Sequence, residues 1–137
     1  MKNTVIADTG PIVALFNRAD RYHQKALSFL EGFDGSLVTT WPVITEATHL
    51  LRASIPAQLN LLEWIRRGGL RIEATDPEAI DRMIALTVKY RDLPMDLADC
   101  SLVILAEDTG IRHVISIDSD YDVYRIFKKE PFVNLFR

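Results

Sequence analysis

The feature of this sequence that most restricts its fold is an alternation of short apolar segments with longer segments of helical periodicity. Five short segments predict β-strands, at residues 4–7, 36–39, 70–73, 114–117 and 132–135. Six longer segments predict helices, at residues 11–16, 22–30, 42–53, 57–67, 76–90 and 96–110. Strands that alternate with helices favour a parallel sheet with helices on both faces. Right-handed crossovers then bring the carboxyl ends of all strands to one edge.

Size and composition favour one α/β domain over residues 1–137 and exclude several other classes of protein. With 137 residues and 48% hydrophobic content, the chain can build a full core and is not expected to be disordered. No apolar run is long enough to span a membrane. The single cysteine, Cys100, cannot form an internal disulfide, and the three histidines are too scattered for a zinc site. We therefore expect a soluble, cytoplasmic protein, and its net charge of −3 argues against a broad basic nucleic-acid surface.

Four acidic residues lie where strands end or within helices near the core, and together they indicate a metal site. Asp8 and Asp118 follow predicted strands, Glu46 lies between core positions of a helix, and Asp99 precedes a wholly apolar helical stretch. In open parallel sheets, ligands bind outside the carboxyl ends of the strands. Acids that converge there repel one another unless a cation neutralises them, and all-oxygen ligands favour Mg²⁺ or Mn²⁺. The pattern points to metal-dependent chemistry on phosphate.

Each of these acids, taken alone, also has a purely structural interpretation. Asp8 can cap the helix that follows it, and Glu46 can lie on a solvated helix face. Asp96 stands three residues before Asp99 and can cap the helix that both begin. The segment 118–122, which is rich in Asp and Ser, can be a polar turn. The acids therefore support a metal site only as a set.

Four short motifs, spread over the whole chain, carry a resemblance to a known family. They are VIADTGP at residues 5–11, TEATHLL at 45–51, LADCSLV at 97–103 and ISIDSDY at 115–121. In order and spacing they resemble the motifs of PIN domains, in particular VapC-type toxins of bacterial and archaeal toxin–antitoxin pairs. The resemblance implies a three-layer α/β/α fold with a short parallel sheet of four or five strands. It also implies an endoribonuclease that needs Mg²⁺ or Mn²⁺ and leaves a 5′-phosphate and a 3′-hydroxyl.

The resemblance extends to particular residues. The four principal acids of the family match Asp8, Glu46, Asp99 and Asp118. We expect Asp8 and Asp99 to ligate the metal, while Asp118 and Glu46 ligate a second ion or orient metal-bound water.

Four further positions match accessory residues of the family. They are Thr9, Asp96, Ser116 and Asp120. Ser116 stands where many members have Thr, so the hydroxyl is kept. Tyr121 stands where Phe is usual.

Besides RNA, the resemblance implies an antitoxin segment laid across the active-site groove, and we also expect a homodimer. The helices at residues 41–53 and 57–67 carry more large apolar residues than one sheet face needs. These are Leu50, Leu51, Leu59, Leu61, Leu62, Trp64 and Ile65. Either they all pack internally, or a second subunit or an antitoxin helix covers some of them.

The residues leave other readings open. A receiver-like phosphoacceptor would need a second acid beside Asp8, where the chain has Thr9, and a non-catalytic interaction module could keep the fold without needing the acids. Basic residues that can contact RNA phosphates, or be ordinary surface charges, are Arg18, Arg66, Arg67, Lys89, Arg91, Arg125, Lys128 and Lys129. Trp41 and Trp64 can stack on bases or pack in the core or an interface.

Overall fold

A five-stranded sheet, in which all neighbouring strands are parallel, forms the centre of the molecule. The computed structural model describes residues 3–137. The strands of this sheet are β1 (Thr4–Ala7), β2 (Ser36–Thr40), β3 (Leu70–Glu73), β4 (His113–Ile115) and β7 (Val133–Asn134). Their order is β3-β2-β1-β4-β7, so that the first strand of the chain lies in the middle. All five predicted strands are present.

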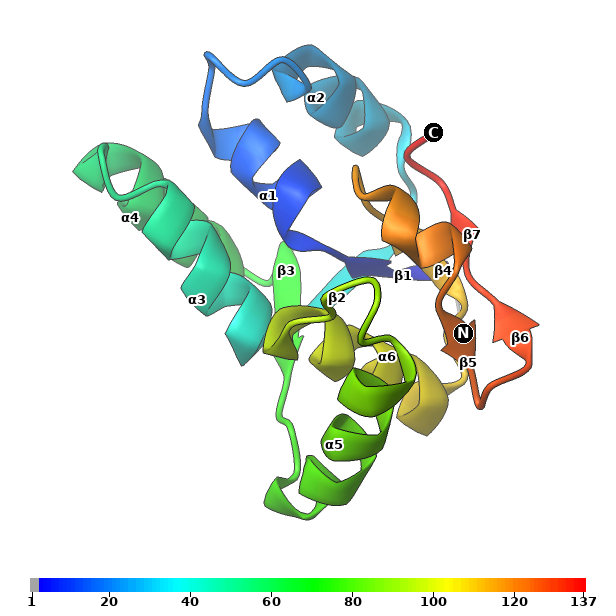
Figure 1. Ribbon diagram of the computed structural model, residues 1–137. Coiled ribbons are helices and arrows are strands. Elements are labelled where there is room, and N and C mark those ends of the chain that lie inside the picture. The colour runs from blue at the N-terminus through cyan, green and yellow to red at the C-terminus, as the bar shows by residue number, and fades with distance from the viewer. Residues whose placement is uncertain (1–2) are drawn as a thin grey trace.

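Helices cover both faces of this sheet, and the predicted three-layer α/β/α fold is confirmed. The α-helices of the described residues are α1 (Thr9–Phe16), α2 (His23–Gly32), α3 (Trp41–Leu50), α4 (Ile55–Arg66), α5 (Ile80–Lys89) and α6 (Leu97–Thr109). In Figure 1, α1 and α2 lie above the sheet, and α5 and α6 lie below it. α3 contacts both α1 and α6, while α4 contacts β3 and extends outward at the left of the view.

The central strand and α6 form the most deeply buried part of the core. Val5, Ile6 and Ala7 of β1 are at most 1% exposed, as expected for a strand covered on both faces. In α6, residues 100–106 are all buried, including the single cysteine. This helix begins at an Asp N-cap and ends at Gly110, whose φ of 77° is the left-handed conformation that terminates helices. The core therefore fixes the position of the end of β1 relative to the start of α6.

The chain after β4 differs from the sequence prediction in two respects. The strand predicted to reach residue 117 ends at Ile115, and Asp118 then caps a short 3₁₀ helix, η2 (Ser119–Asp122). An antiparallel hairpin of β5 (Arg125–Ile126) and β6 (Glu130–Pro131) follows, which the sequence did not predict. Its turn uses positive φ angles at Phe127 and Lys128, although neither is the Gly or Asn that usually marks such a turn.

The other departures are small. The helix predicted from residue 76 starts as a separate 3₁₀ turn, η1 (Pro77–Ala79), before α5. Within residues 3–137, no helix combines the length and apolar character that a membrane crossing requires.

Candidate active site

The four predicted acids line one open pocket of about 290 Å³ at the carboxyl ends of β1 and β4. The residues that line it are Asp8, Thr9, Gly10, Glu46, Leu50, Asp96, Asp99, Ile117 and Asp118. Five of these nine residues are acidic, and within the described part of the chain none of the lining residues is basic. Segments far apart in the sequence therefore bring their carboxylates together at the sheet edge, as the strand order predicts.

Asp8 is buried at the end of the central strand and is held by the neighbouring strand. Its backbone N–H donates to the carbonyl of Ile115 over 3.0 Å, which continues the β1–β4 pairing. The Ser116 hydroxyl donates to Asp8 Oδ2 over 2.7 Å. Although Asp8 occupies the N-cap position of α1, its side chain makes no capping hydrogen bond. The structural interpretation of Asp8 as a helix cap is therefore not supported, and its carboxylate faces the pocket instead.

Ser116 is itself fixed by the outer strand of the sheet. The side chain of Asn134, in β7, accepts a hydrogen bond from the Ser116 backbone N–H over 3.2 Å and donates to its carbonyl over 2.9 Å. The Ser116 hydroxyl also accepts from the Asp118 backbone N–H over 3.0 Å. One serine thus links Asp8 to the segment that carries Asp118.

Glu46 reaches the pocket from α3, where it contacts the first turn of α1. The buried Thr9 hydroxyl donates to Glu46 Oε1, so the carboxylate is half-buried and oriented and does not lie on a solvated face. Gly10, next to Thr9, lets this turn approach the chain after β4, because a Cβ at Gly10 would lie 3.0 Å from Ile117 Cδ1. Thr9 therefore has the position expected of an accessory residue.

Asp99 and Asp96 lie on the first turn of α6 and differ in role. Asp96 is exposed and caps the helix, because its Oδ1 accepts the Asp99 backbone N–H over 2.9 Å. Asp99 is half-buried, and each of its carboxylate oxygens accepts a tyrosine hydroxyl over 3.2 Å, Oδ1 from Tyr121 and Oδ2 from Tyr124. Asp99 thus lies inside the pocket wall, whereas Asp96 serves as the predicted cap at its rim.

Asp118 lies at the exposed side of the pocket, and Asp120 lies outside it. Asp118 Oδ1 accepts the Asp120 backbone N–H over 2.9 Å, which makes Asp118 the cap of η2. Asp120 is not among the pocket-lining residues, although the proximity of Asp118 and partial burial raise the pKa of its carboxyl. The polar-turn interpretation is therefore correct for this segment, and it is compatible with a site role for Asp118.

Burial and mutual repulsion raise the pKa values of two of these acids toward neutral pH. Burial raises the pKa of Asp8 to about 6, an effect that the Ser116 hydrogen bond opposes and that Asp118 and Glu46 reinforce. Burial, followed by the charges of Asp96 and Asp8, raises the pKa of Asp99 to about 7, against the two tyrosine hydrogen bonds. Such shifts are typical of acids that share one site without a cation between them.

The pocket fits a hard divalent cation in the type and charge of its donors. The donor atoms of its five acidic side chains are all carboxylate oxygens, the ligands that hard cations prefer. A divalent cation would also neutralise part of their combined negative charge. Within residues 3–137, no three acidic, histidine or cysteine side chains are gathered as closely as the ligands of one ion. The five acidic side chains line one pocket but are spaced more widely than the ligands around a single bound ion.

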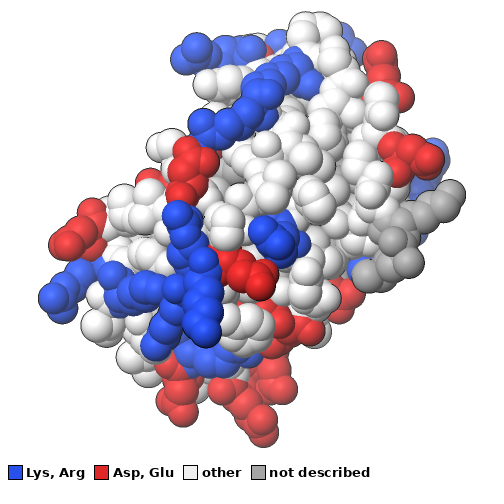
Figure 2. All heavy atoms as spheres, turned by 90° about the vertical axis from the view of Figure 1, so that its right-hand side faces the viewer, with Lys and Arg blue, Asp and Glu red and all other residues white. Residues whose placement is uncertain are grey.

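The basic and aromatic candidates lie outside this pocket. Arg66 and Arg67 pair with Glu63, and Arg125 donates to backbone carbonyls of residues 122–124. Trp64 packs against Phe16 with ring centroids 5.7 Å apart, whereas Trp41 is 56% exposed. The face shown in Figure 2 carries both acidic and basic side chains, and Lys and Arg side chains gather at the lower left of this view.

The sequence and the fold of this chain are similar to those of known proteins. No family model matches the sequence. Ribonuclease VapC26 of Mycobacterium tuberculosis is 24% identical over 116 residues, which make up 83% of this chain and 86% of that protein. The crystal structure of Mycobacterium tuberculosis VapC20, a sarcin–ricin loop cleaving toxin, matches with a TM-score of 0.80 and 20% identity over 93% of this chain and 99% of that chain. The chain has a VapC-type PIN-domain fold. The resemblance stated from the sequence motifs is confirmed.

Within this VapC-type fold, three residues hold the acids in place although the sequence motifs assigned them no such role. Asn134 fixes Ser116, and the buried Tyr121 and Tyr124 hold Asp99. The only available signal was the pair of tyrosines three residues apart in an otherwise polar segment, because a buried tyrosine hydroxyl normally finds a hydrogen-bond partner. The partner of each hydroxyl depends on how η2 packs against α6. A local sequence pattern does not indicate this packing.

Proposed function

We propose that this protein is a metal-dependent endoribonuclease and the toxin of a toxin–antitoxin pair. The expectation of an RNA-cleaving hydrolase is borne out by the two VapC relatives. The observation that carries the metal-dependent mechanism is the convergence of Asp8, Glu46, Asp99 and Asp118 on one pocket at the sheet edge. With RNA as its substrate, the enzyme is expected to act in the cytoplasm.

In the proposed mechanism, Asp8, Asp99 and Asp118 hold a Mg²⁺ or Mn²⁺ ion. When bound, the ion would supply an activated water and neutralise charge on the scissile phosphate. Ser116 keeps the Asp8 carboxylate turned toward the pocket, and Thr9 does the same for Glu46. Glu46 orients water at the α3 side of the site, where it can accept a proton from the attacking water. In-line hydrolysis of this kind leaves a 5′-phosphate and a 3′-hydroxyl.

The surface beside the pocket supports the proposed antitoxin. On α3 and α4, the exposed apolar side chains are Trp41, Leu50, Ile55, Leu59 and Leu62, each between 45% and 60% exposed. A groove of about 380 Å³ between α1 and these helices shares Leu50 with the acidic pocket and also contains Arg18. An amphipathic antitoxin helix on this groove would cover the apolar side chains and reach the acids.

A second apolar surface supports the proposed homodimer. Ile80, Ile84 and Val88 repeat every four residues along one face of α5 and are 55%, 58% and 56% exposed. The sequence analysis did not single out this face. In Figure 1, α5 lies at the bottom of the view, apart from α3 and α4 at the left, so a second copy can cover this face without blocking the antitoxin groove.

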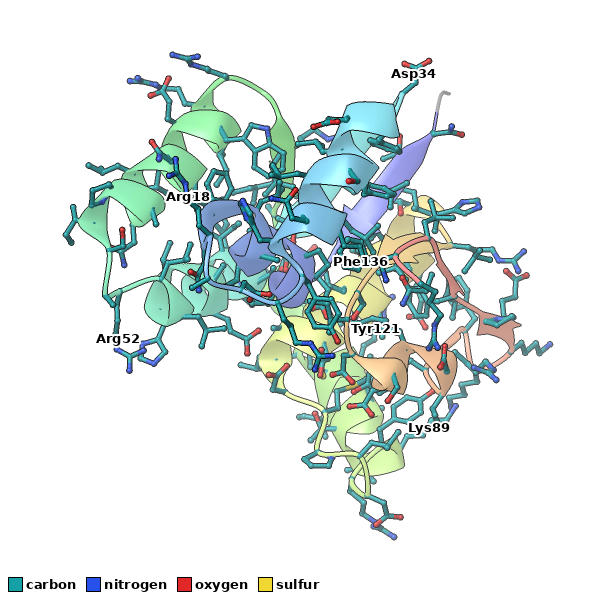
Figure 3. All side chains as sticks on the ribbon, turned by 90° about the horizontal axis from the view of Figure 1, so that it is seen from above. Arg18, Asp34, Arg52, Lys89, Tyr121 and Phe136 are labelled. Atoms are coloured by element: carbon teal, nitrogen blue, oxygen red, sulfur yellow. The ribbon has the colours of Figure 1, made fainter. Side chains whose placement is uncertain are left out.

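The direct test is cleavage of an RNA oligonucleotide pool by the purified chain with Mg²⁺, Mn²⁺ or EDTA. We expect cleavage that needs the metal, products with 5′-phosphates, and loss of activity in Asp8→Asn. Asp34→Asn is the matched control, since Asp34 is an exposed acid far from the pocket (Figure 3). Cleavage that survives EDTA, or that Asp8→Asn leaves unchanged, would refute this assignment.

A further inference from the structure

Two tyrosine hydroxyls occupy both oxygens of a single pocket carboxylate. Tyr121 donates to Asp99 Oδ1 and Tyr124 to Asp99 Oδ2, each over 3.2 Å. Tyr121 is 1% exposed and Tyr124 is fully buried, so neither hydroxyl can exchange this partner for bulk water. In Figure 3, Tyr121 lies near the centre of the view, well inside the rim where Arg52 and Asp34 lie. Two donors on one carboxylate fix both its plane and its rotation.

Packing holds the two phenol rings rigidly. The ring centroids of Tyr121 and Tyr124 are 5.1 Å apart at 82°, and the Tyr121 ring packs edge-on against Phe132 at 5.4 Å. Tyr90, at the end of α5, packs against Tyr124 at 5.0 Å and 67°. Its hydroxyl accepts the Arg125 backbone N–H over 3.0 Å, which fixes the chain directly after Tyr124. Edge-to-face pairs of this kind are the favoured geometry for aromatic rings and leave little freedom to the hydroxyls.

The tyrosines also connect two acids that belong to different elements. Tyr121 lies in η2, the turn that Asp118 caps, whereas Asp99 lies on α6. The two hydrogen bonds to Asp99 therefore tie the segment that follows Asp118 to α6.

We propose that Tyr121 and Tyr124 are positioning residues that set the Asp99 carboxylate, and its spacing from Asp118, for binding the divalent ion. This inference deepens the proposed function and rests on it. Each carboxylate oxygen keeps a free lone pair when it accepts one hydroxyl, so both hydrogen bonds can persist while Asp99 ligates the ion. Outer hydrogen-bond partners of this kind orient metal ligands and tune their affinity.

The test is Mn²⁺ affinity of the purified chain, measured by the electron paramagnetic resonance signal of free Mn²⁺. We expect the double variant Tyr121→Phe/Tyr124→Phe to bind Mn²⁺ about 10- to 100-fold more weakly, as is usual when outer hydrogen bonds to metal ligands are removed. Each single variant should weaken binding less. Tyr90→Phe is the matched control: it removes a hydroxyl from the same aromatic cluster but none that contacts an acid, and it should weaken Mn²⁺ binding much less than the double variant.

A second comparison distinguishes positioning of the Asp99 carboxylate by the tyrosines from a general loosening of the core. In the Asp99→Asn background, the tyrosine changes should have no further effect on Mn²⁺ affinity, because the carboxylate they position is gone. An unchanged affinity in both single variants and the double variant, or an equal loss in Tyr90→Phe, would overturn the inference while Asp99→Asn still tests the metal site. If the wild-type chain binds no Mn²⁺ at all, the proposed metal site and this inference both fail.

Discussion

The Ser116 hydroxyl donates to Asp8 Oδ2 over 2.7 Å and thereby joins the carboxyl ends of the two central strands, β1 and β4. Because both residues are buried, removal of the hydroxyl leaves an acid turned toward the pocket without its donor. A hydrogen bond to a charged group contributes about 1.5–3 kcal/mol. The link is therefore strong enough to decide where the Asp8 carboxylate points.

Ser116→Ala is expected to slow RNA cleavage by about 10- to 100-fold through loss of Asp8 orientation. Ser116→Thr keeps the hydroxyl and should retain most of the activity. Cleavage rates at saturating Mg²⁺, with thermal unfolding of each variant as a control for folding, provide the measurement. Equal rates in the Ala and Thr variants would show that the hydroxyl does not orient Asp8.

Asp99 is expected to matter more for catalysis than Asp96. Asp99→Asn removes a proposed metal ligand that two tyrosines hold in the pocket, so cleavage should fall to near background while the fold remains. Asp96→Asn keeps a side-chain oxygen that can cap α6 and should retain substantial activity. Single-turnover cleavage by the two variants is the comparison. Greater loss in the Asp96 variant would reverse the assignment.

The metal-free protein should lose stability as the pH rises from about 4 toward 8. Asp8 and Asp99 have folded-state pKa values of about 6 and about 7, above the ordinary 3.8, so the folded chain binds more protons than the unfolded chain between these limits. The unfolding free energy therefore decreases with pH across this window. For Asp8, a shift of about two pKa units corresponds to at most about 3 kcal/mol.

Urea unfolding in EDTA at several pH values tests this dependence, and Asp8→Asn isolates one group. The variant should be more stable than the wild type at pH 8 and lose this advantage near pH 4. Because carboxylates bind metal only when deprotonated, added Mg²⁺ should stabilise the wild type more at pH 8 than at pH 5. A wild type that gains stability between pH 4 and 8 relative to Asp8→Asn would contradict the raised pKa of Asp8.

Mutations in the two apolar surfaces should have different effects, one on dimerisation and the other on neutralisation by the antitoxin. Ile84→Glu, on the exposed stripe of α5, is expected to convert a dimer to a monomer in light scattering and leave antitoxin neutralisation intact. Leu59→Glu should instead weaken neutralisation and leave the dimer intact, because Leu59 is exposed on α4, the helix whose Pro56, Ala57 and Asn60 line the groove. A strictly monomeric wild type would remove the dimer from the proposal.

The sequence predicted those parts of the fold that depend on local pattern. β1 is a continuous apolar run and α6 has an Asp cap and a Gly stop, so both were recognisable, and the strand–helix alternation then placed Asp8 and Asp118 at one edge. The hairpin of β5 and β6 was missed because Phe127 and Lys128 adopt positive φ angles without the residues that favour them.

The acids of the site were predictable, but their supports were not. Asp8 and Glu46 were recognisable by position, yet only the packed structure shows that Ser116 and Thr9 hold them. The tyrosine pair on Asp99 depends on how η2 packs against α6. Contacts of this kind join residues distant in sequence, so neither periodicity nor spacing indicates them.

The hydrogen bonds between Ser116 and Asn134 determine when, during synthesis of the chain, the site can be completed. Asp8 and Ser116 lie 108 residues apart, and the strand that steadies Ser116 comes later still. When β1, β2 and β3 have been made, two of the five strands of the sheet, β4 and β7, are still missing. The growing chain therefore passes through most of its synthesis without Ser116, Asn134 and the hydrogen bonds through which they hold the Asp8 carboxylate.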